Sequence, residues 1–562
     1  MVRRWRTPLL LVVVLGALVA LAVGWYRTVP SGLRGVADDV AVTRDPDNAI
    51  RGTVSLTTSD PSTVEVRAVA PGHQLTVGGT DSPATSHDVP LLGLLADTTY
   101  DVAVTVRDAA GDEVASAEVG TLVTTPLPLD QLPPITVDVS QPERMSPGLT
   151  LFNSIYRPPV AGAEPNTHAG YIQVVDAEGR IVWYHNEPGR VQQLVRDDDG
   201  NFLFGIDEDS TRLIAPTGEV LGEWRGTATG SEEGARGYGL SPGEVIDLDV
   251  HSTHHETLET EDGNYVTLTR VVEEVAYPDG LCESSEPGDV ENIVGDAVVV
   301  FDPADGQVLQ ELSFFDAQDV RDDPRPVESD YCSAGYLDPQ FPEGYQPRDW
   351  THANAVIPID DGDTWLVSNR HTDSLWALRA VDDEGGPAGS LRWEVGVDTG
   401  WEMVGDGRWF WHQHAPELQD DGTILLYDNG NLRDDAPEPY SRAVRYAIDP
   451  EAQTIEQLWE HRMDPDVYAS FVGDADRLDI EGGGHSVLIT HGGQTAACEL
   501  PEAEDDTTFV HGQLVEVDEA TNDIVWQLTT RDDEHCEGWG MYRAERIPSL
   551  YPPGWDVTET FE

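Results

Sequence analysis

The sequence feature that most constrains the fold is a two-part phrase that recurs along most of the chain. The first part is a glycine followed by a short apolar run, as in GNFLFGI, GNYVTLTR and GTILLYDNG. The second part is an apolar run, an acidic turn and another apolar run that often ends in tryptophan. Its copies lie at 170–183, 212–224, 297–312, 375–393, 442–459 and 513–526. Because apolar runs around tight turns are typical of hairpins, each repeat predicts a group of antiparallel strands.

Six copies at this spacing predict a six-bladed β-propeller over residues 145–562. The unequal insertions at 277–295 and 315–348 are expected to be long loops on one face. The late segment MYRAERIPSLY is expected to pair with the first blade and close the ring. A parallel β-helix is the structural alternative, but its repeats are shorter and more even. Because no helical periodicity follows residue 30, the predicted fold class is all-β.

A second, smaller domain is predicted before the propeller. Residues 30–44 are polar and form an expected linker, and residues 45–130 contain short alternating runs separated by turn residues. This pattern predicts a small β-sandwich. The run LLADTTYDVAVTV resembles the tyrosine-corner strand of fibronectin type III-like domains, with Tyr100 as the corner residue. The proline-rich stretch PLPLDQLPPI marks the boundary with the propeller.

The N-terminus predicts a membrane anchor over residues 1–29. Residues 7–26 carry no charge, and about 20 apolar residues are what a spanning helix needs. Arg3, Arg4 and Arg6 precede this run, so a cytoplasmic N-terminus and an extracellular body are expected, held at the cell membrane by one transmembrane helix. A cleaved signal peptide is the alternative, although no clear cleavage site follows the run.

The charge balance excludes some partners. The chain has 103 acidic and 33 basic residues, all of the latter arginine, and a net charge of −70. Nucleic-acid binding needs a cationic surface, so no nucleic-acid partner is expected. An acidic, lysine-free surface is similar to that of extreme halophiles, where molar salt shortens the Debye length to roughly 3 Å and screens self-repulsion. An acidic secreted protein is the alternative.

The four cysteines favour disulfides. None of them lies in a C-x-x-C or other metal-type spacing, and disulfides suit an exported protein. Sequence order favours the pairs Cys282–Cys332 and Cys498–Cys536, which is one of three possible connectivities.

Histidines recur at equivalent places in the repeat. Eight residues before the glycine that opens the first part lie His255, Asn354 and His414, and Gln192 has the same offset. His254, His352 and His412 lie one or two residues earlier. The first strand of each propeller blade lines the central channel, so these positions are expected to converge. Arg370 is the cation that could accompany them.

Each of these side chains also has a structural interpretation. A single histidine can be a hydrogen-bonded packing residue, and His251, His371 and His412 are expected to be structural. Trp350, Trp409 and Trp411 are expected to lie partly in the core, yet aromatic walls also suit a flat ligand. The aligned set favours a functional pocket. It could hold a metal, although no known metal spacing is present, or transfer a group such as sulfuryl through a neutral imidazole.

The region from about 145 onward resembles the arylsulfate sulfotransferase (ASST) family of exported six-bladed propellers. The resemblance is carried by SPGLTLFN, HHETLETEDGNYV, DWTHANAVIPIDDGDTWLVSNR and QHAPELQDDGTILLYDNG. It implies transfer of a sulfuryl group from an aryl sulfate ester to a phenolic acceptor through a covalent sulfohistidine, without a nucleotide or other cofactor. Given the acidic composition, we expect a haloarchaeal member of this family.

The resemblance also implies the roles of individual residues. His414 is the expected nucleophile, with His352 and Arg370 as further catalytic residues. One residue of the His254–His255 pair joins them, and the repeat alignment favours His255. The expected substrate contacts are Asn354, His254, Trp350 and Trp411. A late hydroxyl contact of the family could be Thr490, Thr495 or Ser470, and Glu256 stands where an aspartate is expected. Two rivals remain: a non-catalytic surface propeller that binds a ligand or protein, and a histidine metal site.

Overall fold

The computed structural model describes residues 29–79, 82–129, 132–157, 170–207, 210–227, 245–277, 288–322, 348–500 and 507–561. Within these ranges no helix is long and apolar enough to cross a membrane. The predicted anchor falls almost wholly outside them, as do Cys282 and Cys332. The chain divides into two compact units, one of residues 1–127 with 551–562 and one of residues 128–550.

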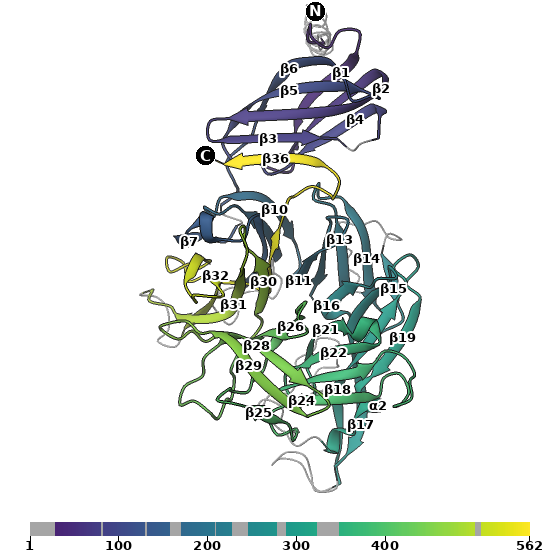
Figure 1. The fold of residues 1–562 in the computed structure, drawn as a ribbon, viewed down its shortest axis with the longest axis vertical. Helices are drawn as coiled ribbons and strands as arrows, with labels where there is room; N and C mark the ends of the chain where they lie inside the picture. Colours follow the sequence, from purple (N-terminus) through teal and green to yellow (C-terminus); the bar gives the residue numbers. More distant parts are fainter. Residues whose placement is uncertain are drawn as a thin grey trace, which may run out of the picture. The chain divides into compact units, whose positions relative to one another are not determined.

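The first unit is built from one seven-stranded sheet (Figure 1). It contains β1 (Ala37–Arg44), β2 (Gly52–Ala70), β3 (His73–Gly78), β4 (Ala84–Leu91), β5 (Thr99–Asp108), β6 (Glu113–Val123) and β36 (Asp556–Phe561). Side chains alternate strictly along β5, so Tyr100, Val102 and Val104 are buried while their neighbours are more exposed. The Tyr100 hydroxyl accepts a hydrogen bond from the Leu95 backbone N–H at 2.9 Å, as expected of a tyrosine corner.

Strand β36 was not expected in this unit. The predicted propeller range of 145–562 includes these last residues, whereas β36 pairs antiparallel with β3, from His73 opposite Phe561 to Gly78 opposite Asp556. A strand that joins an edge across more than 400 residues of chain leaves no local sequence signal, because its partner is not a hairpin neighbour. Tyr551 belongs to the same unit, and its hydroxyl accepts from the Leu92 N–H at 2.8 Å.

The second unit consists of five sheets (Figure 1). The first has β7 (Thr136–Ser140), β8 (Leu149–Arg157), β9 (Gly170–Val175), β10 (Ile181–Glu187), β30 (Asp474–Asp479), β31 (His485–Ala497), β32 (Thr508–Asp518), β33 (Ile524–Thr529), β34 (Gly538–Gly540) and β35 (Ala544–Ile547). The second has β11 (Val191–Arg196), β12 (Phe202–Ile206), β13 (Ser210–Ile214), β14 (Val220–Gly226) and β15 (Ile246–Leu248).

The remaining three sheets follow in chain order. The third has β16 (His254–Glu259), β17 (Tyr265–Ala276), β18 (Val290–Phe301), β19 (Val308–Ser313) and β20 (Arg348–Asp349). The fourth has β21 (Ala353–Ile359), β22 (Thr364–Asn369), β23 (Ser374–Arg379) and β24 (Leu391–Gly396). The fifth has β25 (Glu402–Val404), β26 (His414–Leu418), β27 (Ile424–Asp428), β28 (Arg442–Asp449) and β29 (Thr454–His461).

The predicted all-β class is confirmed. Helix in the described part of the chain is limited to α2 (Phe314–Ala317) and three short 3₁₀ turns. Successive antiparallel sheets joined in chain order are consistent with a β-propeller-like fold. The predicted pairing of MYRAERIPSLY is also present, because β35 pairs antiparallel with β8 from Ala544 opposite Phe152 to Ile547 opposite Leu149.

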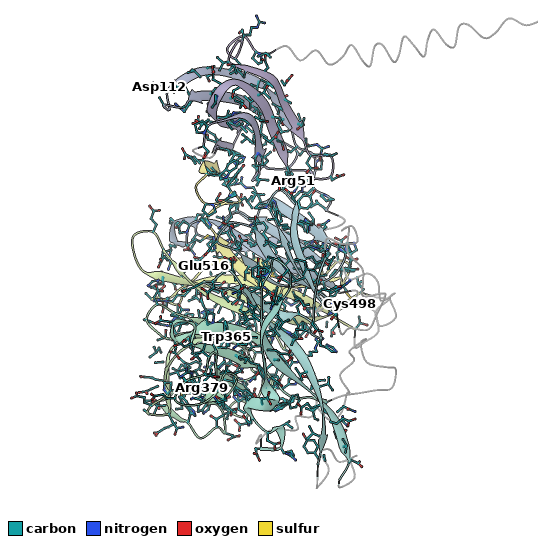
Figure 2. The ribbon with its side chains drawn as sticks, turned by 90° about the vertical axis from the view of Figure 1, so that its right-hand side faces the viewer. Arg51, Asp112, Trp365, Arg379, Cys498 and Glu516 are labelled. Carbon is teal, nitrogen blue, oxygen red and sulfur yellow. A yellow bond between two sulfur atoms is a disulfide. The ribbon has the colours of Figure 1, made fainter. Side chains whose placement is uncertain are left out.

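Aromatic side chains fill the space between neighbouring sheets. Trp365 and Trp376 pack with Trp350 and Phe314 in one hydrophobic cluster, and Trp365 is labelled inside the second unit in Figure 2. Trp350 is only 2% exposed and its ring lies 5.8 Å from that of Trp376. Trp350 thus lies in the core, as the sequence analysis partly expected, and its predicted contact with a substrate stays a prediction.

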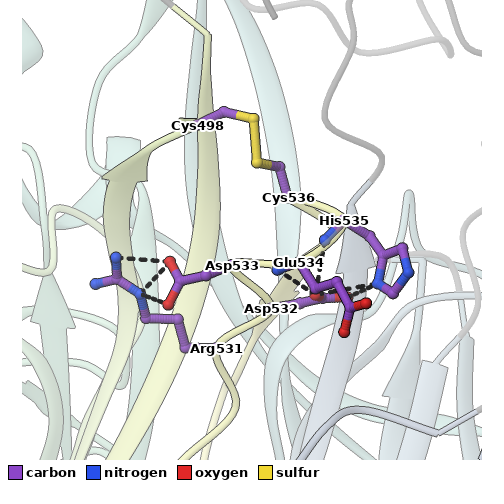
Figure 3. The surroundings of a disulfide bond; sticks show 7 residues. All are labelled: Cys498, Arg531, Asp532, Asp533, Glu534, His535 and Cys536. Carbon is purple, nitrogen blue, oxygen red and sulfur yellow. Dashed lines mark hydrogen bonds and ion pairs between the residues drawn. A yellow bond between two sulfur atoms is a disulfide. The ribbon is translucent and has the colours of Figure 1, made fainter. Parts of the chain in front are cut away.

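The disulfide Cys498–Cys536 is confirmed and lies in the second unit (Figure 3). The bond joins the segment after β31 to the turn before β34, across a separation of 38 residues. Arg531 pairs with Asp533 on the same turn, and Asp532 accepts from the His535 backbone N–H at 2.9 Å. These contacts fix the turn that precedes β34.

Candidate active site

Three successive sheets bring the expected residues together. Strand β16 lies against β21, and β21 lies against β26. Each of these strands begins with a register shift, between His254 and Thr257, between Ala353 and Ala355, and between His414 and Glu417. A β-bulge re-aims the side chains at its position and is common beside active sites. The bulges therefore place His255, Asn354 and His414 at the openings of neighbouring strands.

Strained backbone marks the same place. His255, His352 and His412 have positive φ values of 59°, 46° and 52°, and Ala415 has 47°. Residues other than glycine rarely adopt this left-handed conformation, which costs of order 1–3 kcal/mol each when the surroundings enforce it. Three histidines in this state within one small region indicate a functional site.

His414 begins strand β26. Its side chain is buried, and its Nδ1 lies 2.6 Å from Asn429 Oδ1. Burial, followed by the positive charge of Arg370, lowers the pKa of His414 well below 6.5. His414 is therefore neutral at neutral pH, which is the form in which an imidazole can attack an electrophile.

His352 is oriented by a carboxylate. Its Nδ1 lies 2.5 Å from Asp349 Oδ2, and its ring stacks on that of His371 with centroids 4.6 Å apart. Burial raises the pKa of Asp349 and lowers the pKa of His371 to about 3. His352 is half-buried. A histidine held in this way can donate or accept a proton at its other nitrogen.

The two histidines of the His254–His255 pair have different surroundings. The two Nδ1 atoms are 2.9 Å apart, and His254 Nε2 forms an ion pair with Asp296 Oδ1 at 3.2 Å. Burial raises the pKa of Asp296, but its contact with His254 outweighs burial and brings that pKa to about 2. The ring of His255 lies 5.2 Å from that of His352. His255 thus faces the other imidazoles, while His254 faces back into its own sheet.

Asn354 and Arg370 complete the polar surface around His414. Asn354 donates through Nδ2 to the Gln413 carbonyl at 2.7 Å, which ties β21 to the residue before His414. Arg370 follows β22, is half-buried, and donates to the Ser470 carbonyl at 3.2 Å. Its charge acts directly on His414. Since His255 is also half-buried, the group remains accessible from solvent.

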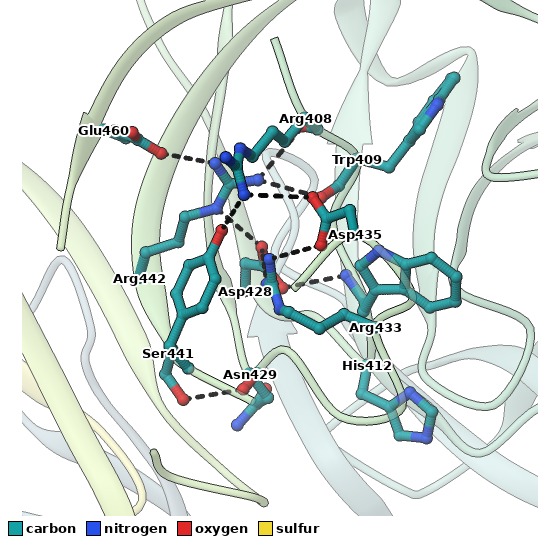
Figure 4. A network of polar contacts seen from close by, with 12 residues as sticks. Arg408, Trp409, His412, Asp428, Asn429, Arg433, Asp435, Ser441, Arg442 and Glu460 are labelled. Atoms are coloured by element: carbon teal, nitrogen blue, oxygen red, sulfur yellow. Dashed lines mark hydrogen bonds and ion pairs between the residues drawn. The ribbon is translucent and has the colours of Figure 1, made fainter. Parts of the chain in front are cut away.

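His412 and Trp411 precede His414 in the chain and are held by carboxylates of neighbouring segments. His412 is about 1% exposed, and both its backbone N–H and its Nδ1 contact Asp373 Oδ1, at 2.6 and 2.9 Å. The Trp411 backbone N–H donates to Asp428 Oδ1 at 3.0 Å. Figure 4 shows Asp428 between Arg433 and Arg442, each of which donates to it at 2.8 Å. This buried ion network holds the segment that precedes His414, and His412 has the structural role expected of it.

The residue after the histidine pair has a different partner. Glu256 accepts two hydrogen bonds from Arg543, both at 2.9 Å, and Arg543 also pairs with Asp474 at 3.3 Å. These side chains line a cavity of about 550 Å³ together with Glu417 and Glu545. Glu256, which stands where an aspartate is expected, therefore forms a buried ion pair with Arg543.

The three candidates for a late hydroxyl contact differ in position. Thr495 is exposed, whereas Thr490 is about 1% exposed within β31. Ser470 meets Arg370 through its backbone carbonyl, which also accepts from Asn431 at 2.9 Å. Ser470 is thus the candidate that directly contacts a residue of the site.

Sequence reasoning missed the side chains that hold the histidines. Asp349, Asp373 and Asn429 each contact an Nδ1 atom, and Tyr542 lies beside His255 with ring centroids 6.3 Å apart. Asp349 could have been found from its place three residues before His352. Asn429 and Tyr542 come from other strands, and no spacing in the sequence links them to the histidines.

One group in the described part of the chain has donor atoms that could bind a metal ion. One ligand atom each of Asp349, His352 and His371 lies within 4.8 Å of the others. Mixed imidazole and carboxylate donors suit zinc and related ions. However, the Nδ1 atoms of both histidines are already in contact with Asp349, at 2.5 and 3.1 Å. These contacts therefore support a second interpretation of the cluster, in which Asp349 orients the two histidines for proton transfer.

Comparison with known proteins identifies the class to which this fold and site belong. Residues 135–543 match the arylsulfotransferase (ASST) family, and the chain belongs to that family. It is 24% identical over 417 residues to an arylsulfate sulfotransferase AssT of Escherichia coli O6:H1, covering 63% of this chain and 64% of that protein. It is 25% identical over 431 residues to AssT of Lelliottia amnigena, covering 67% of this chain and 65% of that protein. The match thus spans less than two thirds of each relative.

Solved structures are more distant. A hypothetical selenium-binding protein from Sulfolobus tokodaii has 12% identity and a TM-score of 0.34, covering 88% of this chain and 95% of that one. Likeness at this level supports no conclusion about function.

Proposed function

We propose that this protein transfers a sulfuryl group from an aryl sulfate ester to a phenol through a covalent intermediate on His414. The observation that carries the proposal is the buried His414 imidazole, which contacts Asn429 and lies close enough to Arg370, His255 and His352 for their charges to lower its pKa. Family membership supports an arylsulfotransferase-type function. We also propose a six-bladed propeller, since the ten-stranded sheet contains strands from two copies of the repeat.

In the first half of the proposed reaction, a lone pair of His414 forms an N–S bond as the S–O bond to the aryl group breaks. The leaving phenoxide, whose conjugate acid has a pKa of about 10, takes a proton from His352 or His255. In the second half, a phenol gives its proton back to that histidine. Its oxygen then forms the new S–O bond as the N–S bond breaks.

Fixed donors lower the barrier to this transfer. Negative charge on the three sulfuryl oxygens resembles that in phosphoryl transfer and is stabilised by oriented cations and N–H groups. Arg370 supplies a guanidinium, and the Asn354 amide is held in place by the Gln413 carbonyl. Binding through these groups requires no nucleotide.

The test is peptide mass spectrometry after mixing the protein with a chromogenic aryl sulfate at molar salt. A sulfuryl adduct on His414 and one equivalent of released phenol are expected. His414→Ala should form no adduct, while His485→Ala, which changes the half-buried histidine at the start of β31, should behave as wild type. Absence of an adduct from wild type, or its persistence in His414→Ala, contradicts the proposal.

The Asp349–His352–His371 cluster favours a second candidate, a metal-binding propeller. Elemental analysis of the purified protein separates the two. A stoichiometric transition metal that is lost in His371→Ala, without adduct formation in wild type, would favour the metal site.

We further propose that the body of the protein works outside the cytoplasm, attached by residues 1–29. The Cys498–Cys536 disulfide supports this, because such bonds persist in oxidising compartments. Protease accessibility of the propeller in intact cells tests this location.

A further inference from the structure

Asn429 is the residue that contacts His414 Nδ1, and its amide can point in only one direction. It follows β27, is fully buried, and donates through Nδ2 to the Ala469 and Val472 carbonyls, both at 2.7 Å. An amide nitrogen carries two hydrogens, and both are used by these carbonyls. A flipped amide would place its oxygen against the two carbonyl oxygens. Oδ1 must therefore face His414.

The two carbonyls are themselves held in place. The Ser441 hydroxyl donates to the Asn429 backbone carbonyl at 2.8 Å, as Figure 4 shows, and accepts from the Ala469 N–H at 2.9 Å. Val472 has a positive φ of 52°, which turns the chain back toward β30. Hydrogen bonds thus hold both the backbone and the side chain of Asn429, and together they determine the position of Oδ1.

An amide oxygen only accepts hydrogen bonds, so the 2.6 Å contact requires the proton of neutral His414 to be on Nδ1. The lone pair is then on Nε2. Two nearby imidazoles, by contrast, are held by carboxylates: His352 by Asp349 and His412 by Asp373. A carboxylate stabilises an imidazolium, whereas a neutral amide fixes the tautomer without adding negative charge. The histidine that must remain uncharged is the one held by an amide.

We propose that Asn429 is a positioning residue for sulfuryl transfer, which holds the His414 imidazole in the tautomer and orientation that present Nε2 to the sulfur. The inference rests on the proposed role of His414. Loss of an orienting partner typically costs 10–100-fold in activity at a site that it supports, because the reactive nitrogen is then presented only part of the time.

The experiment compares wild type with Asn429→Ser and Asn429→Asp. Serine is too short to reach His414, so both tautomers become available. The rate constant for adduct formation is expected to fall 10–100-fold with little change in KM. The sulfuryl group should appear on both Nδ1 and Nε2, distinguished by chromatography against chemically sulfated histidine. Wild type should carry it on Nε2 alone.

Asn429→Asp tests the charge. A carboxylate still accepts from Nδ1, but its second oxygen faces the Ala469 and Val472 carbonyls. The variant therefore gains a titratable pair with His414, and its rate should become pH-dependent near neutrality. The wild-type rate should show no such dependence near neutrality. This pH profile would not change if Asn429 only supported the fold, and either variant alone can decide the question if the other does not fold.

Asn431 supplies a matched control. It lies two residues away and donates to the Ser470 carbonyl, in the same segment that holds Asn429, at 2.9 Å. Asn431→Ser should keep the wild-type isomer ratio and pH profile. Unchanged rate, isomer ratio and pH profile in both Asn429 variants would overturn the positioning role. Absence of any His414 adduct in wild type would instead overturn the proposed function.

Discussion

Burial makes several histidines of the second unit neutral, and His491 shows what this does to stability. His491 is fully buried in β31, and its Nδ1 contacts the Tyr427 hydroxyl at 2.8 Å. Burial lowers its pKa to about 3. In the unfolded chain its pKa returns to about 6.5. The unfolded state therefore binds a proton that the folded state does not, and stability rises with pH between these two values.

A prediction follows for His491→Gln. Above pH 6.5 the native His491 adds no pH dependence, but below it stability is lost by up to about 1.4 kcal/mol per pH unit until the pH approaches the folded pKa. Glutamine can accept from Tyr427 but takes up no proton. The variant should therefore lose less stability than wild type between pH 6.5 and 4, as measured by denaturant unfolding at fixed salt.

His485, the half-buried first residue of the same strand, is the control for this experiment. His485→Gln should show the wild-type pH dependence. Parallel curves for His491→Gln and wild type would mean that His491 takes up its proton without unfolding.

At the scale of elements, the strand openings show how far the sequence could predict the site. The common offset of eight residues correctly indicated that His255, Asn354 and His414 lie on neighbouring strands. The register differs in detail, because β16 has two extra residues in its shift while β21 and β26 have one. In β26 the last paired residue before the shift is His414 itself. In β16 and β21 it is His254 and Ala353, each one residue before the aligned His255 and Asn354.

The physical reason is that apolar periodicity specifies faces and not the length of a bulge. A bulge adds residues where the pattern already ends, so the spacing from the glycine cannot distinguish one extra residue from two. Asn429, Tyr542 and β36 could not be predicted for a different reason: their partners are distant in sequence, and periodicity carries no information about such contacts. A tryptophan beside a histidine motif, such as Trp350, serves equally well in a core, so the sequence could not separate the two roles.

The disulfide leads to a prediction at this scale. Closing a loop of 38 residues restricts the unfolded chain and contributes about 3–4 kcal/mol in the chain-entropy model. Cys498→Ser/Cys536→Ser should lower the free energy of unfolding of the second unit by this amount in chemical denaturation. The single variant Cys498→Ser should show a similar loss, and wild-type stability of the double variant would contradict the prediction.

At the scale of the whole molecule, charge dominates. The chain carries −70 at pH 7, and its ion pairs use only 33 basic residues. Like charges repel over about 30 Å at 0.01 M salt but only about 3 Å at 1 M. Repulsion among the acidic side chains is therefore expected to destabilise the folded state most at low salt.

The melting temperature should therefore rise steeply as NaCl is increased from 0.01 to 1 M, and the protein should lose activity on dilution of salt. Differential scanning calorimetry measures this. Sucrose stabilises compact states without screening charge, so it should not replace NaCl at low ionic strength. A melting temperature independent of salt would exclude the proposed adaptation to molar salt.

The pairing of β35 with β8 has a consequence for the timing of synthesis. Because strands of the propeller emerge from the ribosome in order, β8 has no partner on this edge until the last repeat has been made. Tyr542 and Arg543, which contact His255 and Glu256, arrive in the same late segment. An incomplete chain thus lacks part of the candidate site, so we expect activity only after translation has delivered the closing strand.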